Sequence, residues 1–266
     1  MVDKEENNNF FVRSGVPRIG DKYTLRTGET TSYYFKFTGL QEGKPAEKLL
    51  NIVSSFTAEQ GIETKDLYFI GVPYGASLLG VDLSVSVGNG RRVLARKEPA
   101  KRAETLAEKY FSGRVEVGDR VIFLEDVLTT GDNLAEQISR AREVGLEVDT
   151  AIALVDRRET AFTEGTWPNE KKISAVERFA VVGVSVLTIT NVHSLIPKAV
   201  KLMHQGNVRL IEDIINYYAR HGVDLNVFEK PVHIEEFGDQ KTIYPNHNLN
   251  NKLLQAFIEE GLLTMS

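Results

Sequence analysis

One short segment of the chain contains several residues that could bind a sugar phosphate. Four apolar residues, 121–124, form a run without polar alternation, which predicts a buried strand. Two acids and a short loop follow, and then a helical pattern that ends at Gly145. Loop N–H groups can hold an anion, and paired carboxylates can accept hydrogen bonds from vicinal hydroxyls. We therefore predict a ribose 5-phosphate site formed by Glu125, Asp126, Thr129, Thr130, Gly131, Asp132 and Asn133.

The alternative interpretation of this segment is an ordinary strand end with a helix-capping loop. We disfavour it because two adjacent acids at a buried strand end are costly without a ligand to bind.

A second candidate anion site follows the predicted strand 67–70. Residues 71–76 read Gly-Val-Pro-Tyr-Gly-Ala, a composition that predicts a tight turn whose backbone can approach a ligand. A predicted helix begins directly afterwards, and its N-terminus would stabilise a diphosphate. By itself the segment is a generic strand-to-helix turn. Beside the first segment, however, Tyr74 and Gly75 suit a sugar phosphate that also carries a diphosphate.

Basic and aromatic residues supply two further candidates. Arginine in position 157 could bind a carboxylate through its planar fork, or equally form a structural ion pair with Asp156 or Glu159. Three successive aromatic residues, 33–35, cannot all face one side of a strand, so one or two could stack on a planar ring. A basic cluster could neutralise a diphosphate or simply be a solvated loop; it comprises Arg91, Arg92, Arg96, Lys97, Lys101 and Arg102.

Composition narrows the class of protein. The chain has 266 residues, an ordinary charged fraction and a formal net charge of −5, which gives no reason to expect nucleic-acid binding. It has no cysteine, and its five histidines lack metal-ligand spacing. The polar N-terminus is not a targeting sequence, and no apolar run is long enough to span a bilayer. We expect a cytoplasmic protein without membrane contact.

Alternating strand and helix patterns predict an α/β fold with a parallel sheet flanked by helices. We expect residues 1–22 to be loosely ordered, 23–199 to form the main domain, and 200–266 to form a mostly helical C-terminal appendage. Residues 23–37 predict a hairpin, and 179–189 the last strand of the sheet. Ligands bind beyond the carboxyl ends of such strands, where the candidate segments fall.

The acid pair followed by Thr-Thr-Gly resembles the phosphoribosyl-diphosphate (PRPP) signature of type I phosphoribosyltransferases. Taken with Arg26-Thr-Gly, Ser32-Tyr-Tyr-Phe, Gly71-Val-Pro-Tyr-Gly, Arg96-Lys-Glu and Asp156-Arg, in that order, the chain resembles the orotate branch from about Tyr23 to Thr190. The resemblance implies a phosphoribosyltransferase domain with a small N-terminal hood hairpin. It also implies a glycosyltransferase that makes orotidine 5'-phosphate and diphosphate from PRPP and orotate, in pyrimidine nucleotide biosynthesis. A homodimer and Mg²⁺, held mainly by substrate oxygens, are implied as well.

The resemblance also assigns roles to individual residues. Lys97, Lys101 and Asp126 are the implied catalytic residues. The residues implied to flank or bind orotate are Tyr34, Phe35, Thr129 and Arg157. The residues implied to bind PRPP are Arg26, Tyr74, Gly75, Arg96, Lys97, Lys101, Glu125, Asp126, Thr129, Thr130, Gly131, Asp132 and Asn133.

The chain departs from the family pattern after Glu98. The family continues Arg-Lys-Glu-x-Lys-x-His-Gly, whereas this chain reads Pro99-Ala-Lys-Arg-Ala103, so that the lysine is displaced by one residue and the histidine and glycine are missing. Arg26 stands where the family has a lysine. Two alternatives therefore stay open: a PRPP- or nucleotide-binding regulator without turnover, and a phosphoribosyltransferase for another base.

Overall fold

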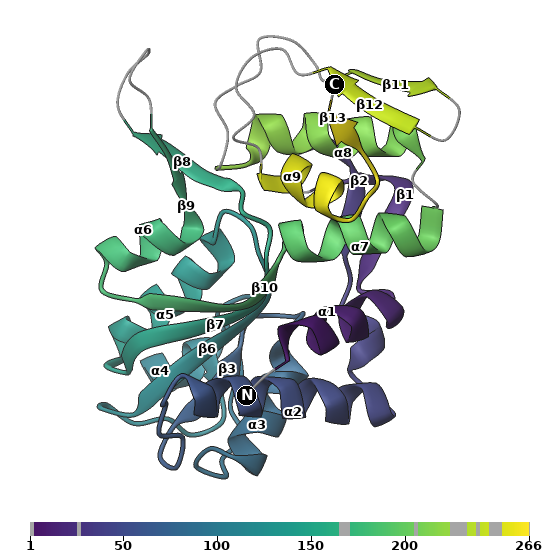
Figure 1. Ribbon diagram of the computed structural model, residues 1–266. Helices are drawn as coiled ribbons and strands as arrows, with labels where there is room; N and C mark the ends of the chain where they lie inside the picture. The colour runs from purple at the N-terminus through teal and green to yellow at the C-terminus, as the bar shows by residue number, and fades with distance from the viewer. Residues whose placement is uncertain are drawn as a thin grey trace.

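A four-stranded parallel sheet forms the centre of the computed structural model (Figure 1). Its strand order is β10-β7-β6-β3, with β3 Tyr68–Gly71, β6 Arg120–Leu128, β7 Glu147–Asp156 and β10 Ser185–Asn191. All neighbouring pairs are parallel, so their carboxyl ends meet at one edge. The structure describes residues 3–25, 28–164, 171–204, 207–223, 233–237, 240–244 and 252–265.

Helices cover both faces of the sheet because its central strands are apolar on both sides. In β6, Val121 and Phe123 belong to one buried cluster, whereas Ile122 and Leu124 belong to another. The first cluster includes residues of α5 Asp132–Val144 and α6 Ala175–Val181. The second includes residues of α2 Gly43–Glu59 and α3 Ser77–Ser86. The prediction of an α/β fold with a parallel sheet flanked by helices is confirmed.

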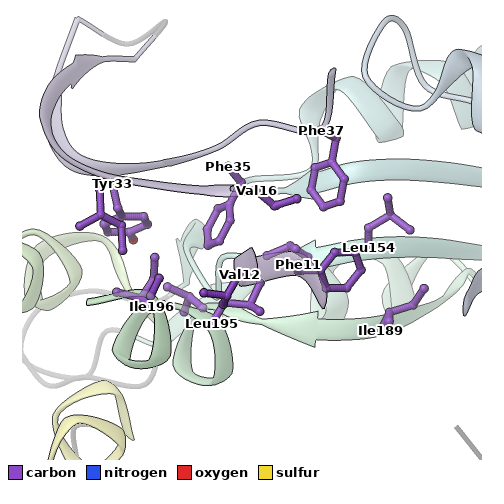
Figure 2. Close-up of a cluster of buried hydrophobic side chains, with 14 of the residues drawn as sticks. Phe11, Val12, Val16, Tyr33, Phe35, Phe37, Leu154, Ile189, Leu195 and Ile196 are labelled. Atoms are coloured by element: carbon purple, nitrogen blue, oxygen red, sulfur yellow. The ribbon is translucent and has the colours of Figure 1, made fainter. Parts of the chain in front are cut away.

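A hood of N-terminal and C-terminal elements stands beside the sheet (Figure 1). It contains α1 Lys4–Arg13, the antiparallel pair β1 Pro17–Thr24 and β2 Thr30–Phe35, and helices α7 Val192–His204 and α8 Val208–His221. Figure 2 shows its apolar interior, where Phe11 and Val12 of α1 lie with Tyr33 and Phe35 of β2 and with Leu195 and Ile196 of α7.

In the hood, the predicted hairpin is confirmed, whereas the prediction for the N-terminal residues is wrong. The hairpin predicted in residues 23–37 is present, although β1 begins earlier, at Pro17. Residues 1–22 are not loosely ordered where the structure describes them. The Asp3 side chain accepts hydrogen bonds from two backbone N–H groups and caps α1, and the apolar face of that helix is buried by α7. The polar run of asparagines concealed this helix in the sequence.

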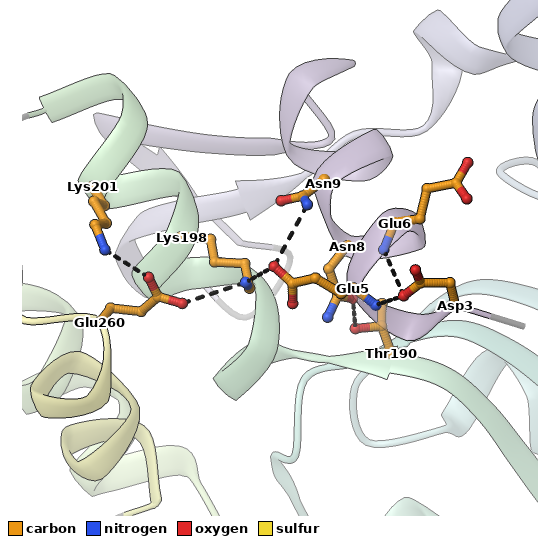
Figure 3. A network of polar contacts seen from close by, with 9 residues as sticks. All are labelled: Asp3, Glu5, Glu6, Asn8, Asn9, Thr190, Lys198, Lys201 and Glu260. Carbon is orange, nitrogen blue, oxygen red and sulfur yellow. Dashed lines mark hydrogen bonds and ion pairs between the residues drawn. The ribbon is translucent and has the colours of Figure 1, made fainter.

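Among the described residues, the C-terminal part contains strands as well as the helices expected there. Strands β11 His233–Phe237, β12 Gln240–Tyr244 and β13 Thr264–Met265 form a small sheet beside helix α9 Lys252–Glu259. Ion pairs connect this unit to α7, because Glu260 lies 3.4 Å from Lys198 and 3.1 Å from Lys201 (Figure 3). The boundary predicted at residue 199 falls inside α7, which is continuous to His204. The division into domains stays a prediction.

The end of α6 and the start of β10 differ from the sequence prediction. Residues 179–189 are not one strand: α6 continues to Val181, and β10 begins at Ser185. The capping box of Ser174 and Glu177 starts that helix and explains why its apolar residues are helical. The remaining elements are η1 Thr38–Leu40, β4 Leu94–Ala95, α4 Leu106–Tyr110, β5 Phe111–Ser112, β8 Thr160–Glu164 and β9 Lys171–Ser174.

Candidate functional site

The loop between β6 and α5 has the form of an anion cradle. Strand β6 continues through the acid pair to Leu128, so the loop before α5 has only three residues, 129–131. Gly131 has φ +81°, and a Cβ there would lie 2.7 Å from the Phe179 ring of α6. Only glycine fits this bend without strain. The first N–H groups of α5 have no acceptor within the helix and point out of its N-terminus, toward the sheet edge.

A side chain that the sequence did not suggest stabilises this loop. Arg178 of α6 donates hydrogen bonds to the Thr130 carbonyl, at 3.1 Å, and to the Asp132 carboxylate, at 2.6 Å. The Thr130 hydroxyl also donates to Asp132, at 2.7 Å. Arg178 and these bonds lower the pKa of Asp132. No spacing in the sequence connects positions 132 and 178, so only the packing of α6 on α5 could identify Arg178.

We expect Arg178→Met to raise the pKa of Asp132 toward the ordinary aspartate value, because the guanidinium that stabilises the anion is lost. Since folding lowers this pKa, the pair stabilises the fold at neutral pH. That contribution is lost as the pH falls below the ordinary aspartate pKa and through the lowered one. NMR titration of the Asp132 carboxyl carbon measures the change. Arg142→Met, at the other end of α5, is the control, and an unaltered Asp132 titration in Arg178→Met would contradict the assignment.

The second predicted cradle lies directly against the first. The turn between β3 and α3 is tight: a Cβ on Gly71 would lie 2.0 Å from the Ala76 carbonyl oxygen. A Cβ on Gly75 would lie 1.8 Å from Oδ2 of Asp126. The turn therefore touches the acid pair, and the structure confirms that the two predicted segments meet. Tyr74, on the same turn, is 72% exposed.

The acid pair occupies two environments at the end of β6. Glu125 is 6% exposed, and Asp126 is partly buried between β6 and the Gly75 turn. Burial raises the pKa of Asp126, although its Oδ1 accepts the Val127 N–H at 2.9 Å. A buried carboxylate that is penalised in this way gains from hydroxyl donors of a ligand, which would replace the lost water.

Part of the basic cluster reaches the same edge. Nζ of Lys97 lies 5.6 Å from the centre of the Tyr74 ring. Arg140 of α5 holds the chain here by donating to the carbonyls of Arg96, at 2.9 Å, and Lys97, at 3.0 Å. Arg96 itself donates to the Glu108 carbonyl at 3.2 Å. The structure thus brings Lys97 to the Gly75 turn, and Lys101 is exposed on the loop that follows.

The three hood aromatics alternate across β2, as predicted. Tyr33 and Phe35 are buried, at 0% and 2% exposure, whereas Tyr34 is 43% exposed and stacks on Tyr23. Phe35 packs into the hood core, so Tyr34 and Phe35 lie on opposite faces of the strand and do not flank a common space. Arg26, the other candidate of the hood, lies outside the described residues.

Arg157 follows β7 and lies at the same sheet edge, since its N–H donates to the Leu128 carbonyl at 2.9 Å. Its side chain is only 2% exposed and forms an ion pair with Glu159 at 2.7 Å. The guanidinium carbon lies 4.8 Å from the centre of the Tyr33 ring. Tyr217 of α8 is a side chain of this cluster that the sequence did not single out.

Together, the parallel sheet, the two cradles at its carboxyl edge and the hood define a type I phosphoribosyltransferase fold. No family model matches the chain. It is 32% identical over 149 residues to the orotate phosphoribosyltransferase of Methanosarcina acetivorans, covering 55% of this chain and 74% of that one. It is 27% identical over 161 residues to the same enzyme of Methanocaldococcus jannaschii, covering 60% of this chain and 86% of that one. The chain belongs to the orotate phosphoribosyltransferase family.

A solved structure agrees in fold. The UMP synthase of Leishmania donovani superposes with a TM-score of 0.61 at 21% identity, over 82% of this chain. This chain spans 42% of the length of that protein.

Within the described residues, none of the helices has the length and apolar character needed to cross a bilayer.

Proposed function

We propose that the protein transfers the 5-phosphoribosyl group of PRPP to orotate, giving orotidine 5'-phosphate and diphosphate. The contact between Gly75 and Asp126 is the observation that carries this proposal, because it joins the two anion cradles around a pair of carboxylates. A ligand that fills this arrangement has a phosphate at one end, a diol in the middle and a diphosphate at the other end. The family relatives named orotate phosphoribosyltransferase support orotate as the second substrate.

Each proposed role follows from the place of the residue at the sheet edge. Loop 129–131 and the N-terminus of α5 bind the 5-phosphate, with Asp132 and Asn133 on the first helical turn. Glu125 and Asp126 accept hydrogen bonds from the ribose hydroxyls and favour the positive charge that develops on the sugar. Tyr74, Gly75, Arg96 and Lys97 bind the diphosphate. Arg157 binds the carboxylate of orotate and orients its ring nitrogen toward C1 of the ribose.

Mg²⁺ fits the donor chemistry of this edge. The two carboxylates are hard oxygen ligands, and no group of three acidic or histidine side chains able to form a protein cage occurs among the described residues. An ion held mostly by diphosphate and ribose oxygens suits such a site, with Asp126 and Glu125 as the nearest protein donors. When bound, Mg²⁺ supplies charge neutralisation for the leaving diphosphate. Loss of turnover on chelation with EDTA, restored by added Mg²⁺, would support this assignment.

Turnover on several bases tests the proposed function. Purified protein is mixed with Mg²⁺, PRPP and either orotate, uracil or a purine base, while base absorbance and diphosphate release are followed. Consumption of orotate with stoichiometric diphosphate supports the proposal. PRPP binding without turnover on any base would favour a regulator instead, an alternative motivated by the altered residues 99–103. Light scattering of the same sample tests the proposed homodimer.

Lys97→Ala is expected to lower kcat by about 10- to 150-fold, because a charge-assisted hydrogen bond to the leaving diphosphate contributes about 1.5–3 kcal/mol. The KM for orotate should change little, since Lys97 lies beside Tyr74, on the turn proposed to bind the diphosphate. Steady-state kinetics with both substrates measure this effect. Lys109→Ala, a change on α4, is the matched control. A kcat equal to that of Lys109→Ala would remove Lys97 from the proposed mechanism.

A further inference from the structure

Four side chains from three distant parts of the chain meet above the end of β7. Arg157 is paired with Glu159, and the Tyr217 hydroxyl of α8 donates to the same Glu159 oxygen at 3.1 Å. Nη2 of Arg157 also lies 3.3 Å from the Tyr217 hydroxyl. The rings of Tyr33 and Tyr217 meet edge to face, with their centres 5.6 Å apart. One nitrogen of the buried guanidinium is therefore held by both α8 and the turn after β7.

The turn that carries Glu159 has a specific backbone conformation. Arg158 has φ +54°, and its N–H donates to Oδ1 of Asp156 at 2.7 Å. A left-handed residue other than glycine is uncommon and needs support from its surroundings. The end of α8 gives that support: Val223 N–H donates to the Arg158 carbonyl at 2.9 Å, and Glu159 forms a β-bridge with Gly222.

The guanidinium of Arg157 nevertheless does not use all of its hydrogen-bond donors. Nε of Arg157 is buried and makes no hydrogen bond of good geometry among the described residues, and the same holds for the buried hydroxyl of Tyr33. This hydroxyl lies close enough to the guanidinium to interact with it electrostatically, but neither group has an anionic acceptor in that contact. Burial raises the pKa of Tyr33 to about 12, so this hydroxyl keeps its proton and can donate. Buried donors without acceptors are costly, and they indicate a site where an acceptor binds. Two such donors on neighbouring side chains suit an anionic oxygen of a ligand.

We propose that Glu159 and Tyr217 are positioning residues, which hold Nη2 of Arg157 so that its Nε and the Tyr33 hydroxyl face the carboxylate of the base. The proposal rests on the proposed function and extends it to the specificity for a carboxylated pyrimidine. Glu159 also balances the buried charge of Arg157 before the base binds. A guanidinium fixed in this way loses less rotational freedom on binding, and its planar fork keeps the direction that a carboxylate requires.

Two nucleotides that differ in one group provide the test. Orotidine 5'-phosphate carries the carboxylate and uridine 5'-phosphate lacks it. The Kd for uridine 5'-phosphate divided by the Kd for orotidine 5'-phosphate therefore reports the carboxylate interaction alone. We expect Tyr217→Phe to lower this ratio several-fold and Glu159→Gln to lower it at least tenfold, with little change in the Kd for uridine 5'-phosphate. Glu159→Asp should keep part of the discrimination. Tyr218→Phe removes a neighbouring buried hydroxyl, bonded to His193, and should leave the ratio unaltered.

A background without the guanidinium separates positioning from a merely structural role. In Arg157→Ala, neither Tyr217→Phe nor Glu159→Gln should alter the ratio further, because there is no guanidinium left to position. The positioning proposal is overturned if the ratio is unaltered in Tyr217→Phe and in folded Glu159→Gln while the unmodified protein discriminates normally. The proposed function would not be affected by that outcome. Should Glu159→Gln fail to fold, Tyr217→Phe decides. Absence of discrimination by the unmodified protein would instead overturn the proposed function together with this inference.

Discussion

Asp126→Asn is expected to weaken PRPP binding by about 10- to 150-fold, which corresponds to the 1.5–3 kcal/mol of a charge-assisted hydrogen bond. The neutral asparagine amide cannot accept charge-assisted hydrogen bonds from two ribose hydroxyls. The substitution also removes a negative charge from beside the positive charge that develops on the sugar. We therefore expect kcat/KM for PRPP to fall at least as much as affinity. Calorimetry with PRPP and Mg²⁺ measures the first effect, and steady-state kinetics measure the second.

The stability of this variant distinguishes lost binding from lost folding. Burial raises the pKa of Asp126, so its charge is penalised in the folded protein, and a neutral asparagine avoids that penalty. Its carbonyl oxygen can still accept the Val127 N–H. The Tm of Asp126→Asn should thus equal or exceed that of the unmodified protein. Asp149→Asn, an exposed position on β7, serves as the control, and PRPP affinity equal to that control would exclude Asp126 from the site.

Gly75→Ala is expected to lower PRPP affinity by more than tenfold. Its added Cβ would lie 1.8 Å from Oδ2 and 2.5 Å from Oδ1 of Asp126, so the carboxylate or the turn must move. Either movement separates the turn proposed to bind the diphosphate from the acids proposed to bind the ribose, because the carboxylate that must move is one of those acids. Forcing a methyl group into a packed contact typically costs about 1–3 kcal/mol. Calorimetric titration with PRPP and Mg²⁺ measures the loss.

Gly39→Ala is the matched control for this substitution. A Cβ on Gly39 has no neighbour within 4 Å, and its backbone is not left-handed, so the same added methyl group meets no contact. PRPP affinity and Tm of Gly39→Ala should match the unmodified protein. If Gly75→Ala bound PRPP as tightly as Gly39→Ala, the contact between the turn and the acid pair would have no part in binding.

Local patterns account for the parts of the site that the sequence predicted. Strand β6, its acid pair and the loop before α5 are contiguous, and each is encoded by residue types that act over a few positions. The apolar run of β6 predicted burial on both faces, and the two buried clusters on either side of that strand agree. The Gly75 turn was recognisable for the same reason. Its contact with Asp126 followed from a general property of parallel sheets, whose carboxyl ends share an edge.

Sequence patterns failed where stabilisation comes from distant segments. Helix α1 has a polar composition and forms because Phe11 and Val12 are buried with α7. Residues 179–189 are apolar throughout, so periodicity could not separate the end of α6 from β10. The C-terminal strands pair with each other across residues for which no alternating pattern was evident.

By itself, the sequence determined the class of fold, the loop before α5, the acid pair and the second turn, because each depends on neighbours in the chain. The tertiary structure decided which groups each of these residues contacts. It showed that Arg178 stabilises Asp132, that Phe35 faces the core, and that Arg157 is held by Glu159 and Tyr217. The bond between Arg178 and Asp132 joins positions 46 residues apart, and that between Arg157 and Tyr217 joins positions 60 residues apart. Burial and mutual orientation arise only when the elements pack, so no local pattern of residues could specify them.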